Sequence, residues 1–324
     1  IEDVPPDNKI VGLFEAGSLQ CDLMMPSAFQ AKTLISRNYL QPFDHSLLSR
    51  GLLPLVNAAF YNPYFDLHNK YVIPYTWGST GIGYDSERVD GLPVSWGTLF
   101  SGAAPPLGPK QPNGFGPITK IVLLDDARFT LGAVLLYLNY VPNTLNPRQI
   151  EEAADLLVRL NKQSGKATPE GNSYYELEYK TNEIPDLLRS SEVALSMAWS
   201  GDIVLAMNSS PSTKPGNTKR SADMPGNSRL RLALPVEGSI LFRDSFMIPS
   251  NADAANLVGV HKFIEFLLQP KNAAEVSEYS YYATTVAGAS AYVDRFIANG
   301  ASFFYNPAGK DYFLEDVGVV TQYY

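Results

Sequence analysis

The sequence predicts an α/β protein with two domains. Its 324 residues are enough for two separate hydrophobic cores. Short apolar runs of strand length recur along the chain and alternate with helical patterns, which is typical of α/β proteins with mostly parallel sheets. The expected strands are Cys21–Met25, Tyr71–Pro74, Val193–Ala198, Leu230–Leu234 and Phe246–Ile248.

One helix has clear start signals. Asn146 can cap the helix, and Pro147 suits the first helical position. Apolar residues then recur at helical spacing, which predicts the buried stripe. The stripe comprises Ile150, Ala154, Leu157 and Leu160.

Two further helices follow from the same reasoning. One begins near Asp253 and stops before Pro270, with its apolar stripe at Leu257, Val260, Ile264 and Leu267. His261 lies off that stripe, which favours an ordinary structural role. The other helix spans Ala127–Tyr140, with an acidic pair ahead of it and the strand Ile121–Leu124 before that pair.

The composition excludes several classes of function. A net charge of −8 and a pI of about 5.0 argue against a protein that binds a phosphate backbone. One cysteine, Cys21, allows no internal disulfide, and the three histidines form no metal-binding spacing, so we expect them at surface or supporting positions. No apolar run approaches the ~20 residues that cross a bilayer. No leader pattern opens the sequence, so we expect any export signal to be removed or missing.

Other motifs were weighed and set aside. The glycines of WGSTGIGYD, at residues 77–85, occur in the wrong order for a nucleotide-binding loop. The pair Tyr281–Tyr282 could ligate a ferric ion, but without a nearby histidine or carboxylate we expect aromatic packing. No nucleophile is accompanied by a base, so we predict that the protein is not an enzyme and needs no cofactor. Residues 101–118 and 208–229 are rich in Pro, Gly, Ser and Asn and are expected to form long loops.

Seven segments occur in the order of one known family. They are CDLMMPS (21–27), YVIPYTWGSTGIGYD (71–85), LLDDAR (123–128), LGAVLLYLNYVPNT (131–144), SEVALSMAWSGD (191–202), PVEGSILFRDSFMIP (235–249) and FIEFLLQPKNAAEVSEY (263–279), with EDVG (315–318) after them. Because these segments follow one another in the family's order, the chain resembles the periplasmic spermidine/putrescine-binding proteins of ABC transporters.

The resemblance implies a fold and a function. The fold is a type II periplasmic-binding-protein fold, with two lobes joined by crossing strands and a ligand cleft between them. Residues 1–80 plus 243–290 would form one lobe, and residues 81–242 plus 291–324 the other. The implied function is capture of a cationic diamine or polyamine, putrescine or spermidine, and its delivery to a membrane ABC permease. We expect a periplasmic or extracytoplasmic monomer that binds no nucleic acid.

The resemblance also implies the ligand-binding residues. Asp244 corresponds to the family's carboxylate that anchors an amine. The other candidates correspond to further ligand-binding positions of the family. The set is Ser27, Phe29, Asp126, Trp199, Phe242, Asp244 and Tyr282. For Asp126 an equally good interpretation is helix capping, because carboxylates are favoured at helix N-termini.

The sequence also departs from the family. It begins where the family has already completed its first strand, so we expect that strand to be missing. Phe129 stands where the family often has an acidic residue, Leu314 where it has glutamine, and the two loops are longer than usual. Two alternatives therefore stay open. One is a divergent member that binds another small solute, and the other is a repurposed subunit without a transport function that binds protein partners.

Overall fold

The computed structural model divides the chain into two compact units. Unit 1 comprises Ile1–Trp77 and Phe242–Ala301, and unit 2 comprises Gly78–Leu241 and Ser302–Tyr324. The structure describes residues 7–48, 56, 60–101, 118–166, 174–208, 226–293, 311–313 and 322–323. The expected loops therefore fall outside the described residues over 102–117 and 209–225, as does EDVG at 315–318.

Two long strands pass from one unit into the other. Strand β2 (Ile73–Asp85) leaves unit 1 after Trp77, and strand β7 (Ser239–Phe246) returns at Phe242. The two strands are neighbours in a sheet. At Gly81 of β2 a Cβ atom would lie 2.5 Å from a Leu232 methyl carbon, so any other residue here would force the Leu232 side chain to move.

Unit 1 has short strands and four α-helices among its described residues. Strand β1 (Leu40–Gln41) pairs with β8 (Ile248–Pro249), and β9 (Ala283–Thr284) pairs with the first part of β2. The helices are α1 (Asp7–Glu15), α2 (Ala31–Ser36), α8 (Leu257–Leu267) and α9 (Pro270–Ser280). Its core joins both chain segments of the unit, at Ile10, Met24, Ala31, Leu34, Leu40, Val72 and Met247.

Unit 2 is built on a mixed sheet. Strand β3 (Ile118–Leu124) runs parallel to both β4 (Tyr174–Lys180) and β5 (Leu195–Trp199). Strand β2 is antiparallel to β5 and to β6 (Leu230–Ala233). The short strands β10 (Asp311–Phe313) and β11 (Gln322–Tyr323) extend the sheet beyond β7. The expectation of mostly parallel sheets was therefore wrong for β2, which pairs antiparallel with β5, β6 and β9.

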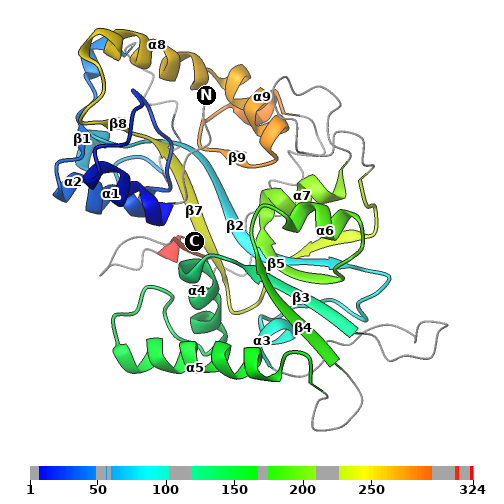
Figure 1. Ribbon diagram of the computed structural model, residues 1–324. Helices are drawn as coiled ribbons and strands as arrows, with labels where there is room; N and C mark the ends of the chain where they lie inside the picture. The colour runs from blue at the N-terminus through cyan, green and yellow to red at the C-terminus, as the bar shows by residue number, and fades with distance from the viewer. Residues whose placement is uncertain are drawn as a thin grey trace. The chain divides into compact units, whose positions relative to one another are not determined.

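Helices cover both sides of the parallel strands of unit 2. Figure 1 shows α4 and α5 on one side of β3 and β4, and α6 and α7 on the other. Residues 121–124 of β3 are consequently buried on both faces, as expected for a continuous apolar run. The helices of the unit are α3 (Gly97–Phe100), α4 (Ala127–Tyr137), α5 (Pro147–Gln163), α6 (Ile184–Arg189) and α7 (Ser200–Met207).

The start signals of the predicted helices are confirmed, but some burial patterns are not. Asn146 accepts a hydrogen bond from the Arg148 N–H at the start of α5. The buried face of α5 is centred on Ala153, Leu156 and Leu160, whereas Ile150 is 38% exposed. Leu160 is thus buried as predicted, whereas Ala154 and Leu157 are only half-buried and their neighbours Ala153 and Leu156 are buried instead.

One other expectation is wrong and one is refined, because His261 has the structural role expected of it but lies in the interior. Cys21–Met25 does not form a strand; it makes only an isolated bridge, through Met24 and Met247. His261 is buried inside unit 1, where its Nε2 accepts a hydrogen bond from the Asp44 N–H at 3.0 Å and its Nδ1 faces the Leu257 carbonyl at 2.7 Å. Both results depend on partners far away in the sequence, which periodicity cannot identify.

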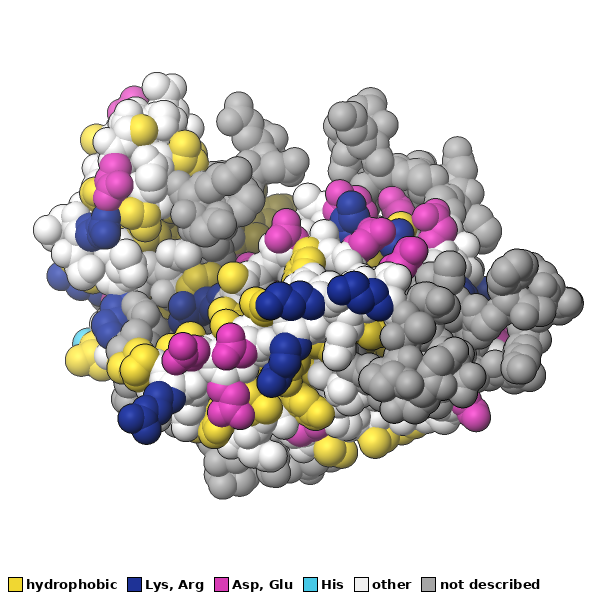
Figure 2. All heavy atoms as spheres, turned by 60° about the horizontal axis from the view of Figure 1, so that its bottom comes forward, with side chains coloured by type: hydrophobic (Ala, Val, Ile, Leu, Met, Phe, Trp, Pro, Cys, Tyr) yellow, Lys and Arg dark blue, Asp and Glu magenta, His cyan; other side chains and the backbone are white. Residues whose placement is uncertain are grey.

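Other features of the described part of the chain limit its chemistry. Among its helices none combines the length and hydrophobicity of a membrane-spanning segment. Within the same residues, no group of three or more His, Cys, Asp or Glu side chains is placed to hold a metal ion. The face seen in Figure 2 carries Lys and Arg side chains as well as Asp and Glu side chains, and it shows no continuous basic surface.

Candidate functional site

In unit 1, Asp244 is presented on a buried strand. Every residue of β7 is buried except Asp244, which is half-buried. The Ser27 hydroxyl donates a hydrogen bond of 2.7 Å to Asp244 Oδ1. Ser27 and Asp244 are also partners in an isolated antiparallel bridge, so the backbone fixes them opposite each other. The result is a carboxylate held in a defined orientation at the surface of a rigid strand.

Aromatic side chains accompany Asp244 in the same unit. The Phe242 and Tyr282 rings meet edge to face, with centroids 5.7 Å apart. Phe242 is buried, whereas Tyr282 is half-buried. Helix α9 ends at Ser280, and the left-handed backbone of its C-cap residue Tyr281 (φ 62°) turns the chain immediately before Tyr282. Phe29 is half-buried in the short 3₁₀ helix that begins just after Ser27.

In unit 2, the carboxylate of Asp126 caps a helix. Its Oδ1 accepts hydrogen bonds from the backbone N–H groups of Arg128 at 2.9 Å and Phe129 at 3.2 Å. Asp126 is the N-cap residue of α4, and its backbone is extended as caps require. The structure therefore gives Asp126 a structural task, and any contact of this residue with a ligand stays a prediction.

Trp199 is the other candidate in unit 2. It ends β5 and is the half-buried residue of that otherwise buried strand. The Phe129 ring packs edge to face against the Trp199 indole, with centroids 5.9 Å apart. Phe129 itself is 3% exposed, so it supports the indole from inside the unit.

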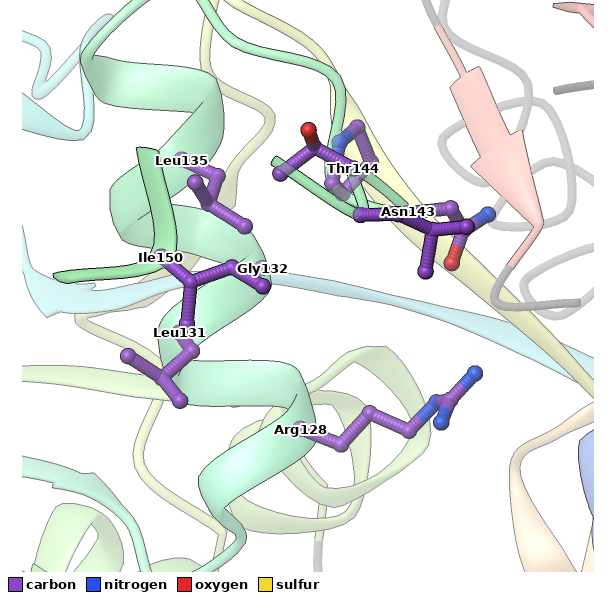
Figure 3. Close-up of a pocket in the computed structure, with 9 residues that line it drawn as sticks. Arg128, Leu131, Gly132, Leu135, Asn143, Thr144 and Ile150 are labelled. Carbon is purple, nitrogen blue, oxygen red and sulfur yellow. The ribbon is translucent and has the colours of Figure 1, made fainter. Parts of the chain in front are cut away.

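A pocket lies next to the start of α4 in unit 2. Its cavity of about 190 Å³ lies between α4, the loop after it and the first turn of α5 (Figure 3). Arg128 is the charged side chain of the lining, Leu131 and Leu135 are among its apolar residues, and neither Asp126 nor Trp199 belongs to it. A cation beside apolar walls suits an anionic or apolar group better than an ammonium group, so we do not assign a cationic solute to this pocket.

Sequence reasoning did not select Trp77 as a site residue. This tryptophan is the half-buried position of β2, whose other residues are all buried. Its ring lies beside that of Phe60, with centroids 5.6 Å apart and planes inclined by 36°. The motif at residues 71–85 marked the strand correctly, but a strand with both faces covered has no alternation to show which side chain stays accessible.

Comparisons with known proteins agree with this description. A family model described as "Bacterial extracellular solute-binding protein" matches residues 7–303. The spermidine/putrescine-binding periplasmic protein of Salmonella typhimurium is 30% identical over 286 residues, which are 87% of this chain and 68% of that protein. The putrescine-binding periplasmic protein PotF of Escherichia coli is 28% identical, over 87% of this chain and 70% of its own length.

Solved structures share the fold. The substrate-binding protein PotD of a spermidine/putrescine ABC transporter from Streptococcus pneumoniae is 25% identical with a TM-score of 0.64, over 91% of this chain and 77% of that chain. A proposed spermidine/putrescine ABC transporter protein from Listeria monocytogenes is 26% identical with a TM-score of 0.71, over 97% of this chain and 84% of that chain. The predicted two-lobed α/β fold is therefore confirmed.

Proposed function

We propose, since this chain belongs to the bacterial extracellular solute-binding protein family, that it captures a linear diamine or polyamine and delivers it to the permease of an ABC importer. Relatives that carry spermidine or putrescine in their names support the ligand class. The same relatives are periplasmic proteins, which supports a periplasmic or extracytoplasmic location for this chain. We further propose that the protein acts as a monomer, with the two units serving as the lobes of the family's fold.

The observation that carries this proposal is the presentation of Asp244. A primary ammonium group needs a carboxylate, and a hydrogen bond to a charged group contributes ~1.5–3 kcal/mol net. Asp244 is the one position of β7 that is not fully buried, and the Ser27 hydroxyl orients its carboxylate. A preoriented carboxylate binds a cation without the loss of side-chain freedom that a flexible surface aspartate would suffer.

The neighbouring rings suit the rest of such a ligand. A polyamine alternates ammonium groups with methylene segments, so it gains from both cation–π contacts and apolar stacking. In unit 1 we propose the half-buried Tyr282 as a ligand contact, with buried Phe242 packed against it. In unit 2 we propose Trp199, supported by Phe129. We retain Ser27, Phe29 and Asp126 as candidates for weaker contacts.

Isothermal titration calorimetry with putrescine, spermidine and spermine tests this proposal. We expect one-to-one binding at micromolar concentrations or tighter, which corresponds to about −8 kcal/mol. The Asp244→Ala variant should show no measurable heat of binding, while its thermal unfolding should still be cooperative. If the wild-type protein binds none of the three amines, the ligand class is wrong and another solute must be sought.

A further inference from the structure

Trp77 lies in a strand that is otherwise inaccessible. Only this position of β2 is half-buried, although tryptophan has the largest apolar side chain in the strand. In the neighbouring strand β7, only Asp244 is half-buried. The positions of these two side chains relative to each other follow from the contacts between their strands.

The contacts show that β2 and β7 run antiparallel. The Tyr75 ring of β2 contacts the Phe246 ring of β7, with centroids 4.6 Å apart. Farther along β2, Thr80 Oγ1 accepts a hydrogen bond from the Ile240 N–H at 3.3 Å. The residue number thus falls along β7 as it rises along β2, which places Trp77 next to Asp244.

The same contacts show that the two side chains share a face. Residues two apart in a strand point to the same side of the sheet. Tyr75 and Phe246 touch and therefore share a face, so Trp77 and Asp244, each two residues away from them, share it too. Trp77 and Asp244 therefore lie in one row of residues that crosses the strands. Ser27, bridged to Asp244, and Ala283, paired with Trp77, extend this row on either side. Directly opposite side chains in such a row have Cβ atoms about 4.5–5.5 Å apart.

We infer that Trp77 is a ligand-binding residue, whose indole contacts the ammonium group that Asp244 holds and the methylene groups next to it. This inference rests on the proposed function and adds a residue that no motif selected. An ammonium bound to Asp244 lies within the ~6 Å over which an indole face attracts a cation. The Phe60 ring packs against the indole and limits its movement, so the aromatic wall is preformed.

Titration of putrescine into Trp77 variants tests the inference. Trp77→Leu keeps an apolar side chain but removes the ring, and it should weaken putrescine binding by about tenfold. Trp77→Phe keeps a poorer ring and should lose only about threefold. Trp96→Phe is the matched control, because Trp96 is fully buried in unit 2 and its indole N–H donates to the Gly238 carbonyl. This control should bind putrescine with the wild-type affinity.

Fluorine NMR of protein labelled with 5-fluorotryptophan gives a second measurement. The chain contains three tryptophans, so three resonances can be assigned from the single Trp→Phe variants. Putrescine should shift the Trp77 resonance with the midpoint seen by calorimetry and leave that of Trp96 unchanged.

Three outcomes decide between the proposals. Absence of binding by the wild-type protein would overturn the proposed function itself. Binding by the wild-type protein with an unchanged Trp77→Leu affinity and an unmoved Trp77 resonance would overturn this inference alone. Equal losses in Trp77→Phe and Trp77→Leu, together with an equal fall in melting temperature, would show a structural role and would also overturn it.

Discussion

In unit 1 Asp244 accepts a hydrogen bond from a serine hydroxyl, whereas in unit 2 Asp126 accepts hydrogen bonds from two backbone N–H groups at the start of α4. The first aspartate stands on a strand and is oriented by a residue 217 positions away. The second is oriented by its own helix. The two aspartates thus differ in their hydrogen-bond donors. The carboxylate of Asp244 is oriented by another side chain, whereas that of Asp126 caps a helix, because the local structure decides which donors are nearest.

The aromatic residues of the two units differ in a complementary way. In unit 1 the half-buried Tyr282 and Trp77 are supported by the buried rings of Phe242 and Phe60. In unit 2 the half-buried Trp199 is supported by buried Phe129. Each unit therefore presents a supported ring, and in unit 1 the rings accompany the half-buried carboxylate of Asp244. Under the proposed function, we therefore expect Asp244 to be the carboxylate that binds the amine.

The largest expected effect is the difference between the two aspartates when each is replaced by asparagine. Asp244→Asn should weaken putrescine binding about 100-fold, because the ammonium group loses its negatively charged partner and keeps only a hydrogen bond to a neutral amide oxygen. Asp126→Asn should change the affinity by less than about threefold and leave stability nearly unchanged, since asparagine caps helices as well as aspartate does. Calorimetry gives both affinities, and thermal unfolding verifies that both variants fold. A loss of affinity of similar size in the two variants would contradict the different tasks that we assign to Asp244 and Asp126.

A smaller effect is expected from the ring that supports Trp199. Phe129→Leu removes an edge-to-face contact worth ~0.5–1.5 kcal/mol and loosens the indole, so putrescine affinity should fall about threefold. Phe100→Leu is the matched control, since Phe100 is also buried in unit 2 and stacks on Trp96 at 6.0 Å. Both variants should lose stability, but only Phe129→Leu should lose affinity. If the two behave alike in calorimetry, Phe129 acts on folding and not on the position of Trp199.

The sequence predicted what depends on near neighbours. The caps of α4 and α5 were found because Asp126 and Asn146 bond to N–H groups within three residues. The strand Val193–Ala198 was found as β5, since a strand buried on both faces consists mostly of apolar residues. The two-lobed fold followed from the order of the motifs, not from periodicity.

The sequence could not predict what depends on distant partners. The donor that satisfies Nε2 of the buried His261 is the Asp44 N–H, which lies 217 residues away along the chain. The accessibility of Trp77 depends on which strands flank β2. The spacing of apolar residues in β2 does not predict these neighbouring strands. For Asp244 the resemblance indicated the residue, but its orienting partner Ser27 had been proposed only as a separate ligand contact.

Two other aspartates of unit 1 have pKa values shifted in opposite directions, one by burial and the other by hydrogen bonds. Burial raises the pKa of Asp66 above the ordinary 3.8, against the opposing effect of three backbone N–H groups that donate to it. At the exposed Asp44, hydrogen bonds from the side chain and backbone of Ser46 lower the pKa. The charge of His45 lowers the pKa of both aspartates, so it does not explain why the two pKa values shift in opposite directions.

The smallest expected effect is therefore a difference in pH dependence. Asp66 binds its proton more tightly in the folded state, so its contribution to stability is complete below pH 3.8 and is lost as the pH rises through the folded pKa. Asp44 behaves in the opposite way: its contribution is present above pH 3.8 and is lost as the pH falls through its lowered pKa. Urea unfolding of the wild type, Asp66→Asn and Asp44→Asn from about pH 2.5 to pH 6.5 measures both differences. The stability advantage of the wild type over Asp66→Asn should shrink as the pH rises, and its advantage over Asp44→Asn should shrink as the pH falls. Slopes of the same sign would mean that burial does not dominate at Asp66 and that its three backbone donors outweigh the cost of burying its charge.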